Sequence, residues 1–156
     1  GPGEYEVRGI LITSVRSYHD KAHGTQHGLN LIAVIHIDDV ACCHLGDLGH
    51  ELNQHQLEAI GNVDVLFIPV GGGETIDTAD ATNIISQLEP RIVIPMHYAS
   101  TQQRFYADLE LAPLDKFLHE MGVKDADPQE KYTINAAMLP RDDEKTRIVV
   151  MSPSNP

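Results

Sequence analysis

Residues 40–50 read VACCHLGDLGH, an apolar run typical of a β-strand that ends just before an aspartate, Asp47. Two further runs have the same form: ILITSV stands before His19, and RIVIP stands before His97. Side chains just past strand ends have rigid supports and remain open to substrate, which is how a catalytic metal must be held. Because all three runs stand just before a side chain that can bind metal, together they predict a metal site on one rim of a sheet.

The composition favours one acidic, soluble domain. The chain has 156 residues, with 23 acidic and 11 basic side chains and a formal net charge of −12, so phosphate backbones would be repelled and nucleic acid is a poor partner. No apolar run approaches the roughly 20 residues that span a bilayer, and no signal peptide is evident. The only cysteines, Cys42 and Cys43, are adjacent, which predicts a reducing, cytoplasmic setting.

The predicted elements begin with hairpins and continue as strands alternating with helices, which indicates a layered α/β domain over residues 1–151. Asn53 and Asp77 are predicted to cap helices, and Asp38-Asp39 to form a tight turn. The polar end, 152–156, is predicted to be disordered. The predicted strands are 4–8, 10–17, 29–37, 40–45, 63–70, 91–95, 132–134 and 147–151, and the predicted helices are 53–60, 78–88 and 111–121.

Five motifs resemble the metallo-β-lactamase-fold hydrolases. More narrowly, the chain is similar to a bacterial and archaeal branch of predicted zinc-dependent hydrolases that is related to ascorbate-phosphate lactonases. The resemblance covers nearly the whole chain, and the GDLGH run followed fifty residues later by PMH is its most specific part. The motifs are GPGEYE (1–6), YHD (18–20), HLGDLGH (44–50), DVLFIPVGG (64–72) and PRIVIPMHY (90–98).

The resemblance implies an αββα sandwich with one or two metal ions along the edge between its sheets. His19 and His97 match histidine ligands of that family, and Asp47 matches the carboxylate that bridges two metals. The implied cofactor is zinc, with manganese or iron as alternatives. Such a centre would generate a metal-bound hydroxide that attacks a small-molecule ester, lactone or phosphoester, and Asp47 would then be catalytic as well as a ligand.

The chain departs from the family in one respect: it has no His-x-His-x-Asp-His motif. Together with the abrupt start at Gly1, which could also be a scar of tag removal, this predicts a sandwich that is incomplete at its N-terminus and inactive as it stands. The alternative is a non-catalytic interaction module that retains the fold. An incomplete sandwich would expose apolar sheet surface, so a homodimer or larger assembly is expected.

Other residues have two interpretations each. His50 either contacts substrate or is a helix-entry histidine. His44, inside a predicted strand, is more typical of a core histidine than of a ligand. The glycines at 71–73 favour a permissive turn over a phosphate cradle. Cys42 and Cys43 are expected in the core rather than as nucleophiles.

Overall fold

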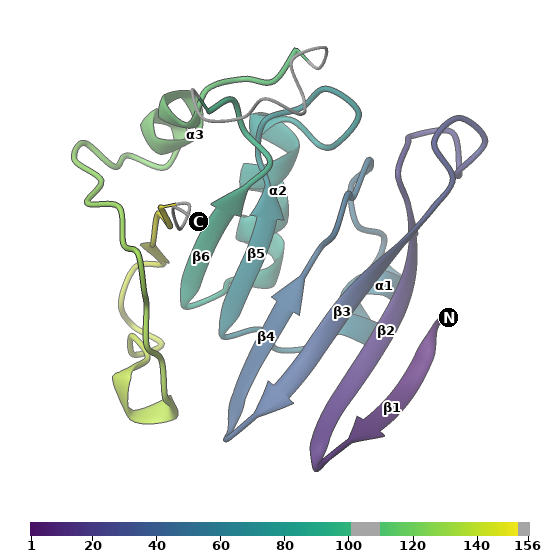
Figure 1. The fold of residues 1–156 in the computed structure, drawn as a ribbon, viewed down its shortest axis with the longest axis horizontal. Coiled ribbons are helices and arrows are strands. Elements are labelled where there is room, and N and C mark those ends of the chain that lie inside the picture. Colours follow the sequence, from purple (N-terminus) through teal and green to yellow (C-terminus); the bar gives the residue numbers. More distant parts are fainter. Residues whose placement is uncertain (101–109, 153–156) are drawn as a thin grey trace.

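The structure, a computed structural model, describes residues 1–100 and 110–152. Seven strands form one mixed sheet in sequence order, and α1 and α2 lie on one side of it (Figure 1). The strands are β1 (Gly3–Val7), β2 (Ile10–Tyr18), β3 (Leu29–Ile37), β4 (Val40–His44), β5 (Val65–Pro69), β6 (Ile92–Met96) and β7 (Arg147–Ile148); the helices are α1 (Gln54–Ile60), α2 (Thr78–Leu88), α3 (Leu114–Glu120) and a short 3₁₀ turn, Ala136–Met138.

The strand directions decide where the loops lie. The first four strands pair antiparallel, whereas β4, β5, β6 and β7 pair parallel. It follows that β2, β4, β5 and β6 run in one direction, so that their C-terminal ends lie on the same side of the sheet, at the top of Figure 1. We call this row of strand ends the upper edge. The loops that follow these four strands are therefore neighbours.

Two tight turns build the antiparallel half. Arg8-Gly9 joins β1 to β2, and Asp38-Asp39 joins β3 to β4; all four residues have positive φ, at 52°, 82°, 46° and 63°. Positive φ at both central positions is the backbone of the turn that matches strand twist in two-residue hairpins. The predicted turn at Asp38-Asp39 is confirmed.

The main core lies between the sheet and the helices. The strands contribute buried Ile32 and Leu66, the helices contribute Ile84 and Phe117, and all four are fully buried. Gln56 of α1 donates from Nε2 to the Arg16 carbonyl oxygen at 2.9 Å, which ties that helix to β2. A smaller cluster occupies the other face of the parallel strands: Val40, Val65, Ile92, Ile94 and Val149, with Tyr132, Ile134 and Leu139 packed against it.

The α/β layering and the capped helices are confirmed. Asn53 accepts from the Gln56 N–H at 2.9 Å and Asp77 accepts from the Asp80 N–H at 2.9 Å, as N-caps do. No helix in the described part of the chain is long and apolar enough to cross a membrane.

Several predictions made from the sequence are wrong, among them the strand 147–151, which ends at Ile148. The third helix begins at Leu114, after Pro113, rather than at Leu111. Residues 132–134 are not a strand, because Tyr132 and Ile134 pack over the smaller cluster on the sheet face instead of pairing at its edge. His44 is exposed on the sheet face rather than in the core. In the end segment that was predicted to be disordered, the Ser152 N–H donates to the Gln129 carbonyl oxygen at 2.9 Å. Residues 153–156 lie outside the described residues.

We expect Asp39→Val to destabilise the chain by about 1–2 kcal/mol, because a β-branched residue is forced into a left-handed conformation. Urea denaturation would measure the loss. Asp39→Gly is the matched control, since glycine adopts this φ without strain and should unfold close to wild type. Equal loss in the two variants would mean that the Asp39 side chain, not its backbone conformation, matters.

Candidate metal centre

The loops at the upper edge are joined to one another through the backbone. The Gly49 N–H donates to the Tyr18 carbonyl oxygen at 3.0 Å, and the Ile76 N–H donates to the Leu48 carbonyl oxygen at 2.8 Å. The Val70 N–H donates to the Met96 carbonyl oxygen at 3.1 Å. These bonds connect the loops after β2, β4, β5 and β6, which carry His19, Asp47, the glycines at 71–73 and His97 respectively.

Two glycines allow these loops to approach. A Cβ atom at Gly49 would overlap the backbone of His19 and Asp20, and a Cβ atom at Gly71 would overlap the carbonyl oxygen of His97. A side chain at either position would therefore push a predicted ligand away. Gly49 and Gly71 therefore have a steric role beside the candidate centre. The close approach at Gly71 also supports the interpretation of residues 71–73 as a turn.

The loop after β2 is organised around one carboxylate. The buried Asp20 accepts four backbone N–H groups, from Ala22, Gly24, Gln26 and His27, at 2.8–3.1 Å. The bond from His27 is the largest of the causes that lower the pKa of Asp20 from 3.8 to about 2. Asp20 therefore stays ionised and fixes the loop that begins at His19.

This loop brings further histidines and a carboxylate to the same edge. The His19 and His27 rings lie 5.5 Å apart between centroids, and His27 Nδ1 is 3.8 Å from Glu74 Oε2 in the loop after β5. Lys21 Nζ pairs with Asp80 Oδ2 of α2 at 3.0 Å, and this partner raises the pKa of Lys21. The loop is thus held to both the β5 loop and α2.

Asp47 is exposed at the tip of its loop and is positioned by Asn30. The Asn30 side chain accepts from the Asp47 N–H at 3.0 Å and donates to Ser17 Oγ and the Leu45 carbonyl oxygen, both at 2.8 Å. The Asp47 carboxylate is thus presented on a fixed backbone. His97 has left-handed φ, 52°, and its Nδ1 lies 3.4 Å from Thr75 Oγ1 of the β5 loop.

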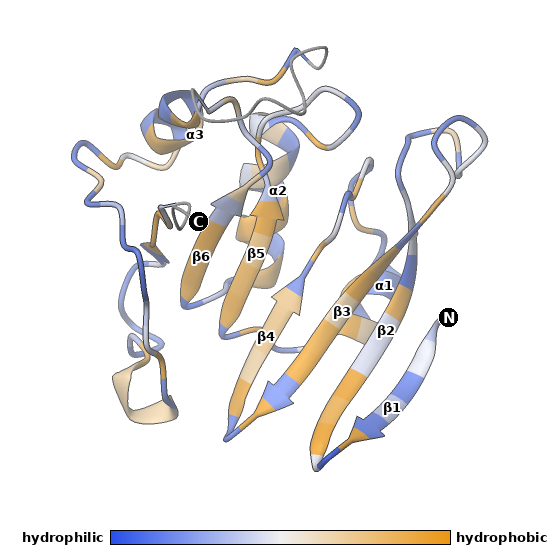
Figure 2. Cartoon of the chain, in the orientation of Figure 1, coloured by the Kyte–Doolittle hydropathy of each residue, from blue (hydrophilic) through white to orange (hydrophobic). Residues whose placement is uncertain are grey.

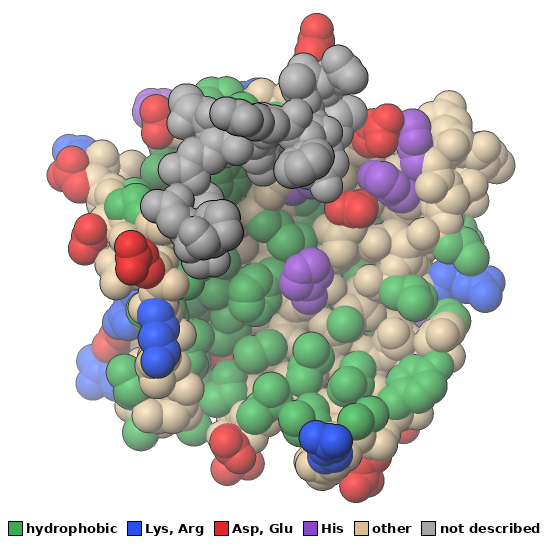
Figure 3. Space-filling view, viewed as in Figure 1, with side chains coloured by type: hydrophobic (Ala, Val, Ile, Leu, Met, Phe, Trp, Pro, Cys, Tyr) green, Lys and Arg blue, Asp and Glu red, His purple; other side chains and the backbone are tan. Residues whose placement is uncertain are grey.

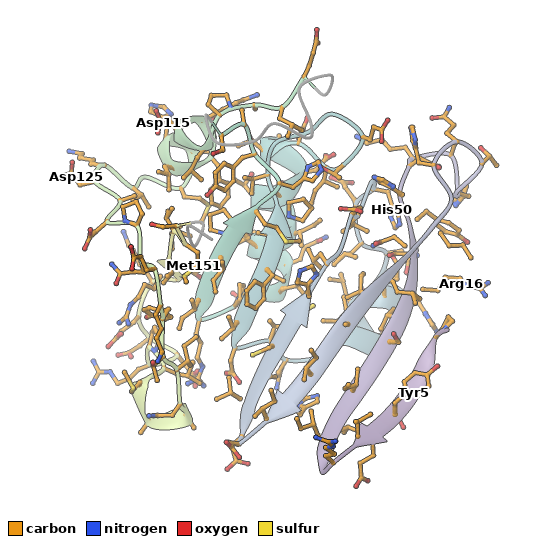
Figure 4. The ribbon with its side chains drawn as sticks, in the orientation of Figure 1. Tyr5, Arg16, His50, Asp115, Asp125 and Met151 are labelled. Carbon is orange, nitrogen blue, oxygen red and sulfur yellow. The ribbon has the colours of Figure 1, made fainter. Side chains whose placement is uncertain are left out.

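His50 forms hydrogen bonds to backbone groups through both of its ring nitrogens. Its Nε2 accepts from the Tyr18 N–H at 3.1 Å, so its Nδ1 must donate to the Glu51 carbonyl oxygen, 2.7 Å away. Figure 4 shows His50 beside the loop that follows β2. This arrangement fits the helix-entry interpretation, in which His50 connects the start of the β2 loop to the end of the β4 loop.

The two cysteines of β4 have core character. Burial raises the pKa of Cys43 to about 12, and burial also raises that of the half-buried Cys42. Thiols with raised pKa values are poor nucleophiles and poor metal ligands near neutral pH.

The three predicted ligands share an edge but do not by themselves form a metal centre. Across residues 1–100 and 110–152, no group of three or more His, Cys, Asp or Glu side chains is arranged to hold an ion. The donor types suit a divalent metal, since imidazole and carboxylate are zinc ligands. The described side chains alone, however, do not surround one ion.

Known proteins resemble this chain over the same region. Residues 1–97 match the model of a family described as a beta-lactamase superfamily domain. A Pyrococcus horikoshii protein named UPF0173 metal-dependent hydrolase is 32% identical over 99 residues, which are 62% of this chain and 44% of that protein. A relative of the same name from Thermococcus onnurineus is 34% identical over 98 residues, again 62% and 44% of the two chains.

Solved structures extend the likeness to the fold. A Thermotoga maritima protein, described as a candidate Zn-dependent hydrolase of the metallo-beta-lactamase superfamily, superposes with a TM-score of 0.74 at 34% identity, over 97% of this chain and 69% of that one. A metallo hydrolase from Ignicoccus hospitalis, at 21% identity and a TM-score of 0.63, shares the fold over 98% of this chain and 56% of its own. The α/β, metallo-β-lactamase-like fold is thereby confirmed.

Asp20→Asn should loosen the loop after β2, because an amide cannot accept four N–H groups as a carboxylate does. Charge-assisted hydrogen bonds are stronger than neutral ones, so protection of these amides from hydrogen exchange should fall at least about tenfold. Gln26→Ala, in the same loop, is the control: the Gln26 side chain is exposed and only its backbone N–H bonds to Asp20, so protection should change little. Unchanged protection in Asp20→Asn would contradict the role given to Asp20.

Proposed function

This chain belongs to the β-lactamase superfamily, and from that membership we propose that it supplies part of the metal centre of a metal-dependent hydrolase. Its contribution is His19, Asp47 and His97. The observation that carries the proposal is their common support: each follows a strand that ends at the upper edge, on loops joined by backbone hydrogen bonds.

The proposed roles follow from the donor chemistry. His19 and His97 offer neutral imidazole nitrogens, and Asp47 offers two carboxylate oxygens that suit a position between two cations. Zinc is the proposed metal, with manganese or iron as alternatives. The proposed substrates are small esters, lactones or phosphoesters, and this class rests on the family resemblance alone. The free cysteines Cys42 and Cys43 support a cytoplasmic location.

The proposal concerns the complete gene product rather than this chain in isolation. The chain spans 44% of the length of the curated relatives and 69% of the Thermotoga maritima structure. Its described residues hold no three-ligand group, so a working centre needs further ligands. We therefore expect this chain alone to bind zinc weakly and to be inactive.

A second candidate function is a non-catalytic interaction module that keeps the fold. The absence of a three-ligand group within the described residues favours it for the isolated chain. The two functions differ in what the complete gene product does with metal. An enzyme retains tightly bound metal and hydrolyses esters, whereas a module does neither.

In the complete gene product, Asp47→Asn should lower the zinc affinity and the rate of ester hydrolysis by at least about 100-fold each, and zinc content should fall with the affinity, because the change removes a ligand and not merely an outer-shell partner. Metal content would be measured by mass spectrometry, and turnover with p-nitrophenyl acetate and bis-p-nitrophenyl phosphate.

Asp39→Asn is the matched control, since Asp39 is an exposed aspartate in a turn at the opposite edge, and asparagine tolerates its positive φ. Its metal content and turnover should equal those of the wild type. Full zinc content and full turnover in Asp47→Asn would refute the role proposed for Asp47. A wild-type gene product without metal or turnover would favour the interaction module.

A further inference from the structure

Thr75, in the loop after β5, is a buried polar residue at the upper edge. Its exposed fraction is 8%, although Figure 3 shows histidine and acidic side chains on the surface of this edge, beside the loop after β2. Buried hydroxyl groups need hydrogen-bond partners, because an unpaired polar group in the interior costs free energy. The partners of the Thr75 hydroxyl include His97, a proposed metal ligand.

The Thr75 hydroxyl connects two loops. Its Oγ1 donates to the Gly72 carbonyl oxygen at 3.0 Å, within the loop after β5, and lies 3.4 Å from Nδ1 of His97, in the loop after β6. A hydroxyl has one proton and two acceptor lone pairs. Because the proton is used in the shorter bond to Gly72, the hydroxyl presents a lone pair to His97. The Nδ1 atom of His97 must then be the donor.

The loop after β5 holds this hydroxyl in place. The Gly72 N–H donates to the Ile76 carbonyl oxygen at 3.1 Å, and the Thr75 N–H donates to the Gly72 carbonyl oxygen at 3.3 Å. Ile76 is fully buried, and Figure 2 shows that the strand leading into the loop, β5, is hydrophobic. The hydroxyl therefore has a fixed position against which an imidazole ring can be oriented.

The backbone of His97 is constrained from the other side. Its φ of 52° is left-handed, which is uncommon for a residue with a side chain. Its carbonyl oxygen lies so close to Gly71 that a Cβ atom at Gly71 would overlap it. Such conformations persist where the surrounding structure imposes them, and they cluster at functional sites. The backbone contacts thus fix where the imidazole begins, and the contact with Thr75 fixes how the ring is turned.

We propose that Thr75 is a positioning residue for His97: it accepts from Nδ1, keeps the ring proton there and leaves the lone pair of the neutral imidazole on Nε2. The inference rests on the proposed function, from which the ligand role of His97 comes. A histidine that binds metal through one nitrogen generally donates through the other, and the acceptor fixes the tautomer and the ring orientation. In this chain the acceptor is a side chain, so a substitution can remove it.

The first test is the tautomer of His97 in the metal-free complete gene product. Nitrogen-15 NMR at about pH 8.5, where an unperturbed imidazole is neutral, distinguishes the protonated ring nitrogen from the one with the lone pair. The His97 signals are those lost in His97→Gln. Wild type and Thr75→Ser should carry the proton on Nδ1. Thr75→Val, which has a similar shape and no hydroxyl, should lose this preference.

His50 is the internal reference for this measurement. Backbone groups hold both of its ring nitrogens, so its proton should stay on Nδ1 in every variant. A change at His97 without a change at His50 would show that Thr75→Val acts on one ring and that the fold of the upper edge is retained.

The second test is zinc affinity, measured by competition with a chelator. Thr75→Val should weaken zinc binding about 10–100-fold, the usual effect of losing the partner of a ligand, and Thr75→Ser should bind as wild type does. Thr82→Val is the matched control. The Thr82 hydroxyl also donates to the carbonyl oxygen three residues earlier, at 2.9 Å, but it lines a pocket with Arg91, which precedes β6 and so lies at the opposite edge. This variant should keep the wild-type affinity.

The outcomes separate the inference from the proposed function. A proton on Nε2 of His97 in the wild type, or a wild-type tautomer or wild-type zinc affinity in Thr75→Val, would overturn the inference. Equal weakening in Thr75→Ser would also overturn it, since the methyl group rather than the hydroxyl would then matter. A wild-type gene product that binds no zinc would overturn the proposed function instead, because the tautomer is measured without metal and decides by itself whether Thr75 orients His97.

Discussion

Two backbone hydrogen bonds, from Gly49 to Tyr18 and from Ile76 to Leu48, hold the upper edge of the sheet together. The bond between Ile76 and Leu48 is shielded from water because both residues are fully buried, and the donor of the other bond, Gly49, is buried as well. The Gly49 bond requires the absence of a side chain, since a Cβ atom there would overlap the backbone at His19. The placement of His19 and Asp47 relative to each other depends on these contacts.

Local chemistry made part of this fold predictable. The capping box of Asn53 with Gln56, the cap of Asp77 and the turn at Asp38-Asp39 each involve residues at most three apart, so the sequence pattern specifies them. The direction of the strands followed from the order of hairpins and helices. The strand ends then sufficed to predict His19, Asp47 and His97 as residues of one edge.

The parts of the fold and of the site that were not predicted depend on contacts between residues far apart in the sequence, which no local pattern encodes. Asp20 accepts from residues up to seven positions ahead, and Asn30 contacts residues 13 to 17 positions away. Asp20 stands in a quoted motif and Asn30 in a predicted strand, yet the roles of both become apparent only once the loops are folded. Residues 132–134 had the composition of a strand, but the side chains of so short a run can equally pack over a sheet face, as Tyr132 and Ile134 do here. His44 is exposed because its side of β4 belongs to the same surface as Ala33 and Leu31.

The central claim is that His19, Asp47 and His97 of one edge bind the same metal centre. Anomalous X-ray diffraction at the zinc absorption edge, on crystals of the complete gene product grown with zinc, tests it most directly. The account predicts one or two anomalous peaks at about 2.0–2.2 Å from donor atoms of these three side chains. A zinc peak coordinated elsewhere, with all three side chains outside its coordination shell, would contradict it.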